Sequence, residues 1–169
     1  MRKSKLLLVA FCFLVSLSDL KSQEVISSKN SIFFEILGNG GLYSINYERR
    51  LSADLYVRIG FSSFLSIDFV GGDTGGRITT FPVLLTYLSG QKKSHFEIGG
   101  GMLFGKDNSY QVPGAIIDLT SFIGYRYQAP GKGFLFRVGF TPFLSLDNKA
   151  NYPDKGISLS GGISLGYHF

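Results

Sequence analysis

The last segment of the chain, residues 157–169, alternates between apolar residues and small or polar ones almost without interruption. Side chains of a β-strand point to opposite faces in turn. One face therefore carries Ile157, Leu159, Ile163, Leu165, Tyr167 and Phe169, and the other carries Ser158, Ser160, Gly162, Ser164, Gly166 and His168. Such a strand separates an apolar environment from a polar one, and a terminal aromatic ring suits a membrane interface. The segment predicts a transmembrane β-strand.

Eight segments share this two-residue period, and turn residues bound each of them. They are residues 31–37, 42–50, 55–67, 78–88, 95–104, 115–127, 134–146 and 157–169. Most reach the roughly 9–11 residues that a tilted membrane strand needs. The pattern predicts an all-β fold, an eight-stranded antiparallel transmembrane β-barrel with up-and-down topology.

The connections between these segments differ in length in a regular way. Residues 50–54, 89–94 and 128–133 form short turns, whereas 69–77, 105–114 and 147–155 form longer loops. Outer-membrane barrels have short periplasmic turns and longer external loops, which predicts that both termini lie in the periplasm. The tight turn at 38–41 would then be an external hairpin turn. Pro82 lies inside a predicted strand, so we expect a bulge or a local kink there.

The first 22 residues have the pattern of a cleaved signal peptide. Basic residues at positions 2, 3 and 5 precede an apolar run over 6–17, and small and polar residues follow. The run is too short to cross a bilayer as a helix. We predict a signal peptide over residues 1–22 and one outer-membrane barrel domain over residues 23–169.

Composition excludes several classes of function. Residues 1–22 hold four of the 17 basic residues and one of the 12 acidic ones, so their removal lowers the net charge from +5 to +2. With no basic stripe left, we expect no nucleic-acid partner. The only cysteine, Cys12, lies in the signal peptide, so the mature chain has no disulfide and no thiolate metal site. We expect no cofactor.

The charged residues of the predicted strands all fall on the polar faces. They are Glu35, Glu48, Arg58, Glu97, Asp118, Arg126, Arg137 and His168. An Arg or Lys that faces lipid at the membrane midplane costs about 2–4 kcal/mol, so these faces must line the lumen. The interior of an eight-stranded barrel is just wide enough for side chains to fill it.

Six of these groups lie near the periplasmic ends of their strands and predict a lumen ion-pair network. They are Glu48, Arg58, Glu97, Arg126, Arg137 and His168. Glu48 faces Arg58 across a hairpin, which predicts a cross-strand pair. One interpretation is an ion-pair plug that closes the lumen. The other is a charged constriction that selects ions, with Asp118 higher in the lumen as a possible solute contact.

Two further alternatives are an enzyme and a soluble barrel. A lipid-modifying enzyme would need a histidine beside a serine, but Ser94 and His95 point to opposite faces, and Ser164 lies about 13 Å from His168 along the strand. We therefore predict no catalytic residue, and two histidines on separate strands predict no metal site. A soluble lipocalin-like barrel would instead enclose the apolar faces around a ligand.

Aromatic residues gather towards the predicted periplasmic ends of the strands. Tyr47, Tyr87, Tyr125, Tyr127, Tyr167 and Phe169 would form an aromatic girdle at the membrane interface. This placement favours the membrane barrel over the soluble one.

Two stretches of sequence resemble known outer-membrane proteins. The final Gly-Ile-Ser-Leu-Gly-Tyr-His-Phe is similar to the signal by which barrels are recognised for assembly. Residues 41–51, Gly-Leu-Tyr-Ser-Ile-Asn-Tyr-Glu-Arg-Arg-Leu, and Val57-Arg58-Ile59-Gly60-Phe61 resemble uncharacterised small outer-membrane barrels of the Bacteroidota type, OmpA/OmpX-like or porin-like.

This resemblance implies a place in the outer membrane of a Gram-negative bacterium. Its partners would be outer-membrane lipid and the barrel-assembly machinery, which would read the strand that ends at Phe169. The implied role is structural or a surface interaction through the longer loops, with no indication of the external partner. A narrow porin-like channel for small solutes is the alternative, followed by a lipid-modifying enzyme.

Overall fold

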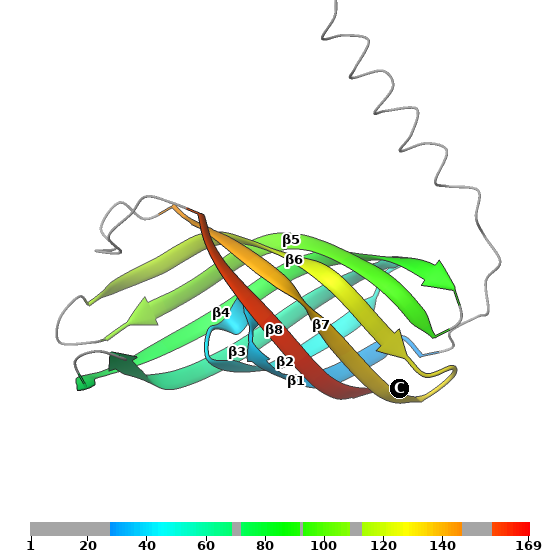
Figure 1. Ribbon diagram of the computed structural model, residues 1–169, viewed down its shortest axis with the longest axis horizontal. Helices are drawn as coiled ribbons and strands as arrows, with labels where there is room; N and C mark the ends of the chain where they lie inside the picture. The colour runs from blue at the N-terminus through cyan, green and yellow to red at the C-terminus, as the bar shows by residue number, and fades with distance from the viewer. Residues whose placement is uncertain (1–27, 69–71, 92, 109–112, 147–156) are drawn as a thin grey trace, which may run out of the picture.

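The computed structural model describes residues 28–68, 72–91, 93–108, 113–146 and 157–169. In this part, eight antiparallel strands form a closed barrel in which each strand pairs with its neighbours in sequence and β8 pairs with β1 (Figure 1). The elements are β1 Asn30–Leu37, η2 Gly38–Gly40, β2 Tyr43–Arg50, β3 Leu55–Asp68, β4 Gly72–Gln91, β5 Ser94–Asp107, β6 Gly114–Gln128, β7 Gly133–Ser145 and β8 Ile157–His168. The predicted eight-stranded up-and-down barrel is confirmed.

Several predicted features fall outside the described residues. The predicted signal peptide at 1–22 lies outside them, as do residues 69–71, 109–112 and 147–155 of the predicted long loops. No helix in the described part of the chain is both long and apolar enough to cross a membrane.

The two chain termini meet at one end of the barrel. The backbone N–H of Asn30 donates to the carbonyl of Phe169 at 3.0 Å, and the N–H of Phe169 donates to the carbonyl of Asn30 at 2.8 Å. The short turns after β2, β4 and β6 lie at this end because the strands alternate in direction. We call it the termini end and the opposite end the loop end.

The strands extend further towards the loop end than predicted. Residues 72–77, predicted as loop, belong to β4, which runs for 20 residues. β5 continues to Asp107, and β6 starts at Gly114, so both ends of the predicted loop at 105–114 belong to strands. The extensions of β5 and β6 pair with each other in register, whereas the extension of β4 pairs with β3 across a register shift. Neither extension shows the period-two alternation of apolar residues that predicts a strand.

Pro82 produces no bulge, which was one of the two irregularities predicted there. β4 stays in register with β5 at Pro82, which faces Leu103, although the ladder to β3 is interrupted opposite Gly60. A Cβ atom on Gly60 would lie 2.8 Å from Cγ of Pro82, so the missing side chain makes room for the ring. The register shift lies elsewhere, between Leu65 and Ile67 of β3.

The barrel is apolar outside and polar inside. In the described part, 20 buried residues are polar and only seven are apolar, whereas large apolar side chains cover the outer surface. A soluble barrel has the opposite arrangement, with its apolar residues inside and its polar residues outside. The observed arrangement therefore rules out the lipocalin-like alternative. Among the predicted girdle residues, Tyr47, Tyr87, Tyr125, Tyr167 and Phe169 are exposed on the outer surface and Tyr127 is half-buried.

Two adjacent glycines of β5 offer a direct test of the close packing between strands. A Cβ atom on Gly101 would lie 2.0 Å from the carbonyl oxygen of Val83, whereas one on Gly100 would meet nothing within 4 Å. We predict that Gly101→Ala lowers the free energy of unfolding by about 1–3 kcal/mol. Urea unfolding of the refolded barrel measures this change. Gly100→Ala is the matched control, and equal stability of the two variants would contradict the packing described.

Candidate functional site

Six charged side chains fill the centre of the lumen. Each has no exposed area, and each comes from a different strand. They are Glu35 of β1, Glu48 of β2, Arg58 of β3, Glu97 of β5, Arg126 of β6 and Arg137 of β7. Three carboxylates and three guanidinium groups make the cluster electrically neutral. We call these six residues the lumen ion cluster.

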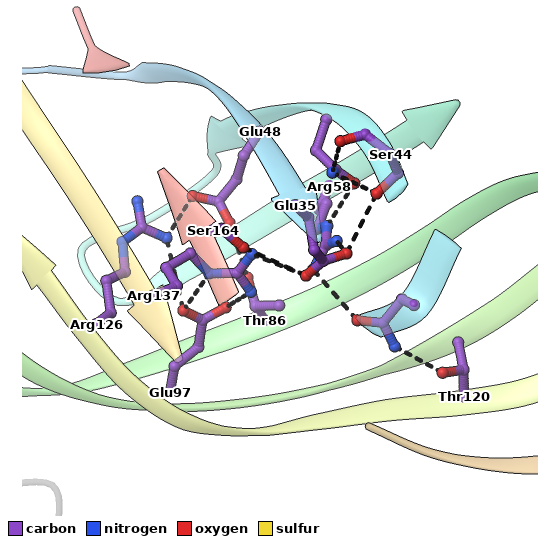
Figure 2. A network of polar contacts seen from close by, with 12 residues as sticks. Glu35, Ser44, Glu48, Arg58, Thr86, Glu97, Thr120, Arg126, Arg137 and Ser164 are labelled. Carbon is purple, nitrogen blue, oxygen red and sulfur yellow. Dashed lines mark hydrogen bonds and ion pairs between the residues drawn. The ribbon is translucent and has the colours of Figure 1, made fainter. Parts of the chain in front are cut away.

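Each arginine of the cluster has one principal carboxylate partner (Figure 2). Arg58 pairs with Glu35, and Nη1 of Arg126 lies 2.5 Å from Oε1 of Glu48. Arg137 binds Glu97 through two parallel hydrogen bonds, Nη2 to Oε1 at 2.5 Å and Nε to Oε2 at 2.9 Å. Charge-assisted bonds of this bidentate kind combine strength with a fixed geometry.

Longer contacts join the three pairs into one network. Nη1 of Arg126 lies 3.9 Å from Glu97, and Nη1 of Arg137 lies 3.8 Å from Glu35. Hydroxyl groups add weaker bonds to the same carboxylates. They are Ser44 and Ser164 to Glu35, and Thr86 to Glu48. A buried ion pair needs such extra partners to offset the cost of removing its charges from water.

Aromatic rings pack between the guanidinium groups. The ring of Phe33 lies 5.0 Å from the guanidinium carbon of Arg58 and 4.6 Å from that of Arg137. Arg137 also lies 4.4 Å from the ring of Phe122, and Arg126 lies 5.1 Å from the ring of Tyr56. Cation–π attraction at these distances stabilises the charged form of the arginines. The aromatic rings also fill the space between the guanidinium groups.

The predicted external turn at 38–41 instead folds into the barrel. It forms η2, whose residues Gly38, Asn39 and Gly40 are all buried. The Asn39 amide nitrogen donates to Thr120 Oγ1 at 2.6 Å and to the Ser121 carbonyl at 3.0 Å, on the far wall of the lumen. The Thr80 hydroxyl donates to the Gly40 carbonyl at 2.8 Å. η2 therefore forms a floor across the lumen.

The backbone of this turn explains its glycines. Gly38 and Gly41 have φ angles of 85° and 95°, which favour glycine, and Leu37 also has a positive φ of 58°. A Cβ atom on Gly38 would lie 2.6 Å from Cδ of Glu35. Arg58 connects the turn to the ion cluster, because its Nη1 donates to Oδ1 of Asn39 at 3.3 Å. The floor and the ion cluster are thus one hydrogen-bonded unit.

The partners within the cluster differ from those predicted. Glu48 and Arg58 are in register, but Arg58 pairs with Glu35 and Glu48 pairs with Arg126. The sequence placed Glu35 on the lumen face but not in the network. The strands tilt around a barrel, so the nearest partner of a long side chain across the lumen is not its neighbour in the ladder.

His168 was predicted as part of the lumen ion-pair network, but no ion pair of the described residues includes it. Its Nδ1 lies 2.8 Å from the Ser28 hydroxyl, which donates its proton to the Gly131 carbonyl. No hydrogen bond or ion pair of the described residues joins His168 to a carboxylate, the third group that a nucleophile and its base use. Ser94 and His95 point to opposite faces of β5, where Ser94 contacts Tyr125 on the outer surface at 3.0 Å.

Asp118 is half-buried on the lumen face of β6, two residues nearer the loop end than Thr120. No ion pair of the described residues includes it, and its in-register neighbours are Leu103 and Ser145. Within the described ranges, no group of three or more metal-ligating side chains comes together.

A closed eight-stranded barrel with a polar lumen and an apolar outer surface is the fold of small outer-membrane proteins. The N-terminal β-barrel domain of OprF from Pseudomonas aeruginosa superposes with a TM-score of 0.61 at 14% identity, over 84% of this chain and 99% of that one. Neisserial surface protein A (NspA) gives 0.51 at 12% identity, over 83% and 92%. These likenesses show the fold. No protein-family model and no curated protein sequence matches the chain.

The ion cluster makes a prediction about stability. Glu35→Gln keeps the side-chain shape but leaves Arg58 without its partner charge, so we expect the free energy of unfolding to fall by about 3–5 kcal/mol. Urea unfolding in lipid vesicles measures the loss. Asp118→Asn, which removes a lumen carboxylate outside the described ion pairs, is the matched control. If Glu35→Gln is as stable as the control, the Arg58–Glu35 ion pair is not required for the stability of the barrel.

Proposed function

We propose that this chain is an outer-membrane barrel of a Gram-negative bacterium whose lumen is closed to solutes. Its role would be structural or a surface interaction at the loop end. The termini end would face the periplasm, as short turns and longer loops indicate. The more specific assignment, that the chain resembles outer-membrane barrels of the Bacteroidota type, remains a prediction.

One observation supports this proposal: buried side chains and the η2 turn cross the lumen at two successive levels. The ion cluster fills it with fully buried, mutually paired charges, and the η2 floor crosses it from β1 to β6. A conducting lumen needs solvated charges along a continuous path. Here the charges bind one another, so moving an ion through would require breaking buried pairs.

The narrow channel is the competing proposal, in which Asp118 and the charged ring would select small solutes. An enzyme is a weaker alternative: His168 lies beside the Ser28 hydroxyl, but no hydrogen bond or ion pair of the described residues joins this histidine to a carboxylate that could orient it. The two main proposals differ in electrical behaviour, which a planar bilayer can measure.

We predict that the wild-type barrel shows no steady conductance in planar bilayers. An Arg58→Ala, Arg137→Ala double variant removes two of the three guanidinium groups, leaves uncompensated carboxylates and should leak ions. Arg77→Ala, on the exposed surface of β4, is the matched control and should remain silent. A steady current through the wild type would instead make the chain a pore.

Recognition by the assembly machinery is a separate proposal that rests on the terminal strand. The Phe169 side chain is exposed, while its backbone pairs with Asn30. Phe169→Ala keeps the backbone bonds, so we predict normal refolding into lipid vesicles but less folded barrel in cells. Heat-modified mobility on gels measures both. Equal folded yield in cells would remove Phe169 from the recognition signal.

A further inference from the structure

Positive charge gathers at the termini end of the barrel. Five cationic side chains and one carboxylate side chain of the described residues lie there: Lys29, Arg49, Arg50, Lys93 and Lys132, against Asp54. Even with the Phe169 carboxylate counted, this end keeps an excess of positive charge. At the loop end, the side chains that the structure describes are balanced, with Arg77 and Lys106 against Asp107 and Asp118. The charge of the barrel is therefore polarised towards its termini end.

Three of these cations occupy neighbouring positions, where β1 begins and β2 ends. The backbone N–H of Arg50 donates to the Lys29 carbonyl at 2.7 Å, and Arg49 is in register with Asn30. Lys29 and Arg49 are exposed, and Arg50 is half-buried. No ion pair of the described residues includes any of the three. Because like charges that face one another destabilise a sheet, this arrangement favours an anion from outside the chain.

A row of apolar and aromatic side chains lies beside these cations on the outer surface. Tyr47 of β2, Ile32 of β1 and Tyr167 of β8 are in register with one another. Their exposed fractions are 37%, 48% and 50%. The next outward-facing row towards the termini end holds Asn30 and Arg49. A lipid molecule at this place would meet apolar surface along its acyl chains and a cation at its headgroup.

The Tyr47 hydroxyl marks the depth at which the apolar outer surface gives way to polar groups. It donates to Oδ1 of Asn30 at 2.8 Å, so it points towards the termini end. A tyrosine at a membrane interface places its ring against hydrocarbon and its hydroxyl at the level of the headgroups. Arg49 is in register with Asn30, and Lys29 precedes Asn30 in the chain. Both cations therefore lie at the level of the lipid phosphates.

We propose that the outer surface of β8, β1 and β2 at the termini end binds an anionic phospholipid, whose phosphate lies against Lys29 and Arg49. We call this surface the rim site, and it consists of Lys29, Asn30, Ile32, Tyr47, Arg49 and Tyr167. Arginine binds phosphate through paired N–H donors, and lysine adds a point charge. Each cation near a membrane surface raises the affinity for anionic lipid about fivefold. This proposal rests on the proposed membrane location.

The chain contains no tryptophan, so a single introduced tryptophan can report which lipids contact the rim site. Tyr167→Trp places the reporter in the site. Phe96→Trp, 52% exposed on β5 at the same end, is the matched reporter on the opposite side of the barrel, where Lys93 is the nearby cation in the chain. Each variant is reconstituted into vesicles that mix phosphatidylglycerol with phosphatidylcholine, and one lipid at a time carries bromine on its acyl chains. Bromine quenches tryptophan on contact, so the two quenching curves give the relative affinity of the two lipids.

We expect Tyr167→Trp to favour phosphatidylglycerol by about 5–25-fold, since each of two cations contributes about fivefold, and Phe96→Trp to favour it less. Adding Arg49→Gln to the Tyr167→Trp protein should lower the preference about fivefold, whereas Arg49→Lys keeps the charge and should retain most of it. Lys132→Gln removes an exposed charge from the β6–β7 turn and is the matched control, which should leave the preference unchanged.

Equal affinity of the two lipids at Tyr167→Trp would overturn the proposal, as would a preference that Arg49→Gln leaves unchanged. Ile32→Trp, in the same row, replaces Tyr167→Trp if that variant does not refold. If neither lipid quenches the reporter at either position, the result would instead contradict the membrane location on which the proposal rests.

Discussion

Everything inside this barrel follows from the cost of placing a charge against lipid. Six ionisable side chains of the strands have no outward position available to them, so they converge in a lumen barely wide enough to hold them. There, each arginine has no exposed area and pairs with a carboxylate. The neutral cluster that results fixes the relative positions of six strands, because a small change in register would separate its partners.

The η2 turn depends on the same cluster and divides the lumen in two. Arg58 binds both Glu35 and Asn39, so the network holds the turn inside the barrel. With its tip turned inwards, the β1–β2 hairpin is too short to complete the wall at the loop end. A closed floor and an incomplete wall thus have one cause.

Period-two patterning could predict where the strands lie, which face of each strand points outwards, and that the charges line the lumen. Each of these features depends on local alternation alone. The ion-pair partners could not: the ladder places Glu48 opposite Arg58, yet tilt and side-chain length bring Arg58 to Glu35 and Glu48 to Arg126. The Gly-rich turn at 38–41 was predicted as an external hairpin. Its inward direction depends on Thr80, Thr120 and Ser121, which are distant in sequence.

The sequence by itself therefore determined an eight-stranded barrel with a charged interior, because alternation records which side of each strand meets lipid. Only the tertiary structure decided which charges pair and that the turn at 38–41 points into the lumen. These features arise from contacts between strands that are far apart in the chain, and their geometry is set by barrel closure. Local pattern carries no information about such distances, whereas packing within a narrow lumen fixes them.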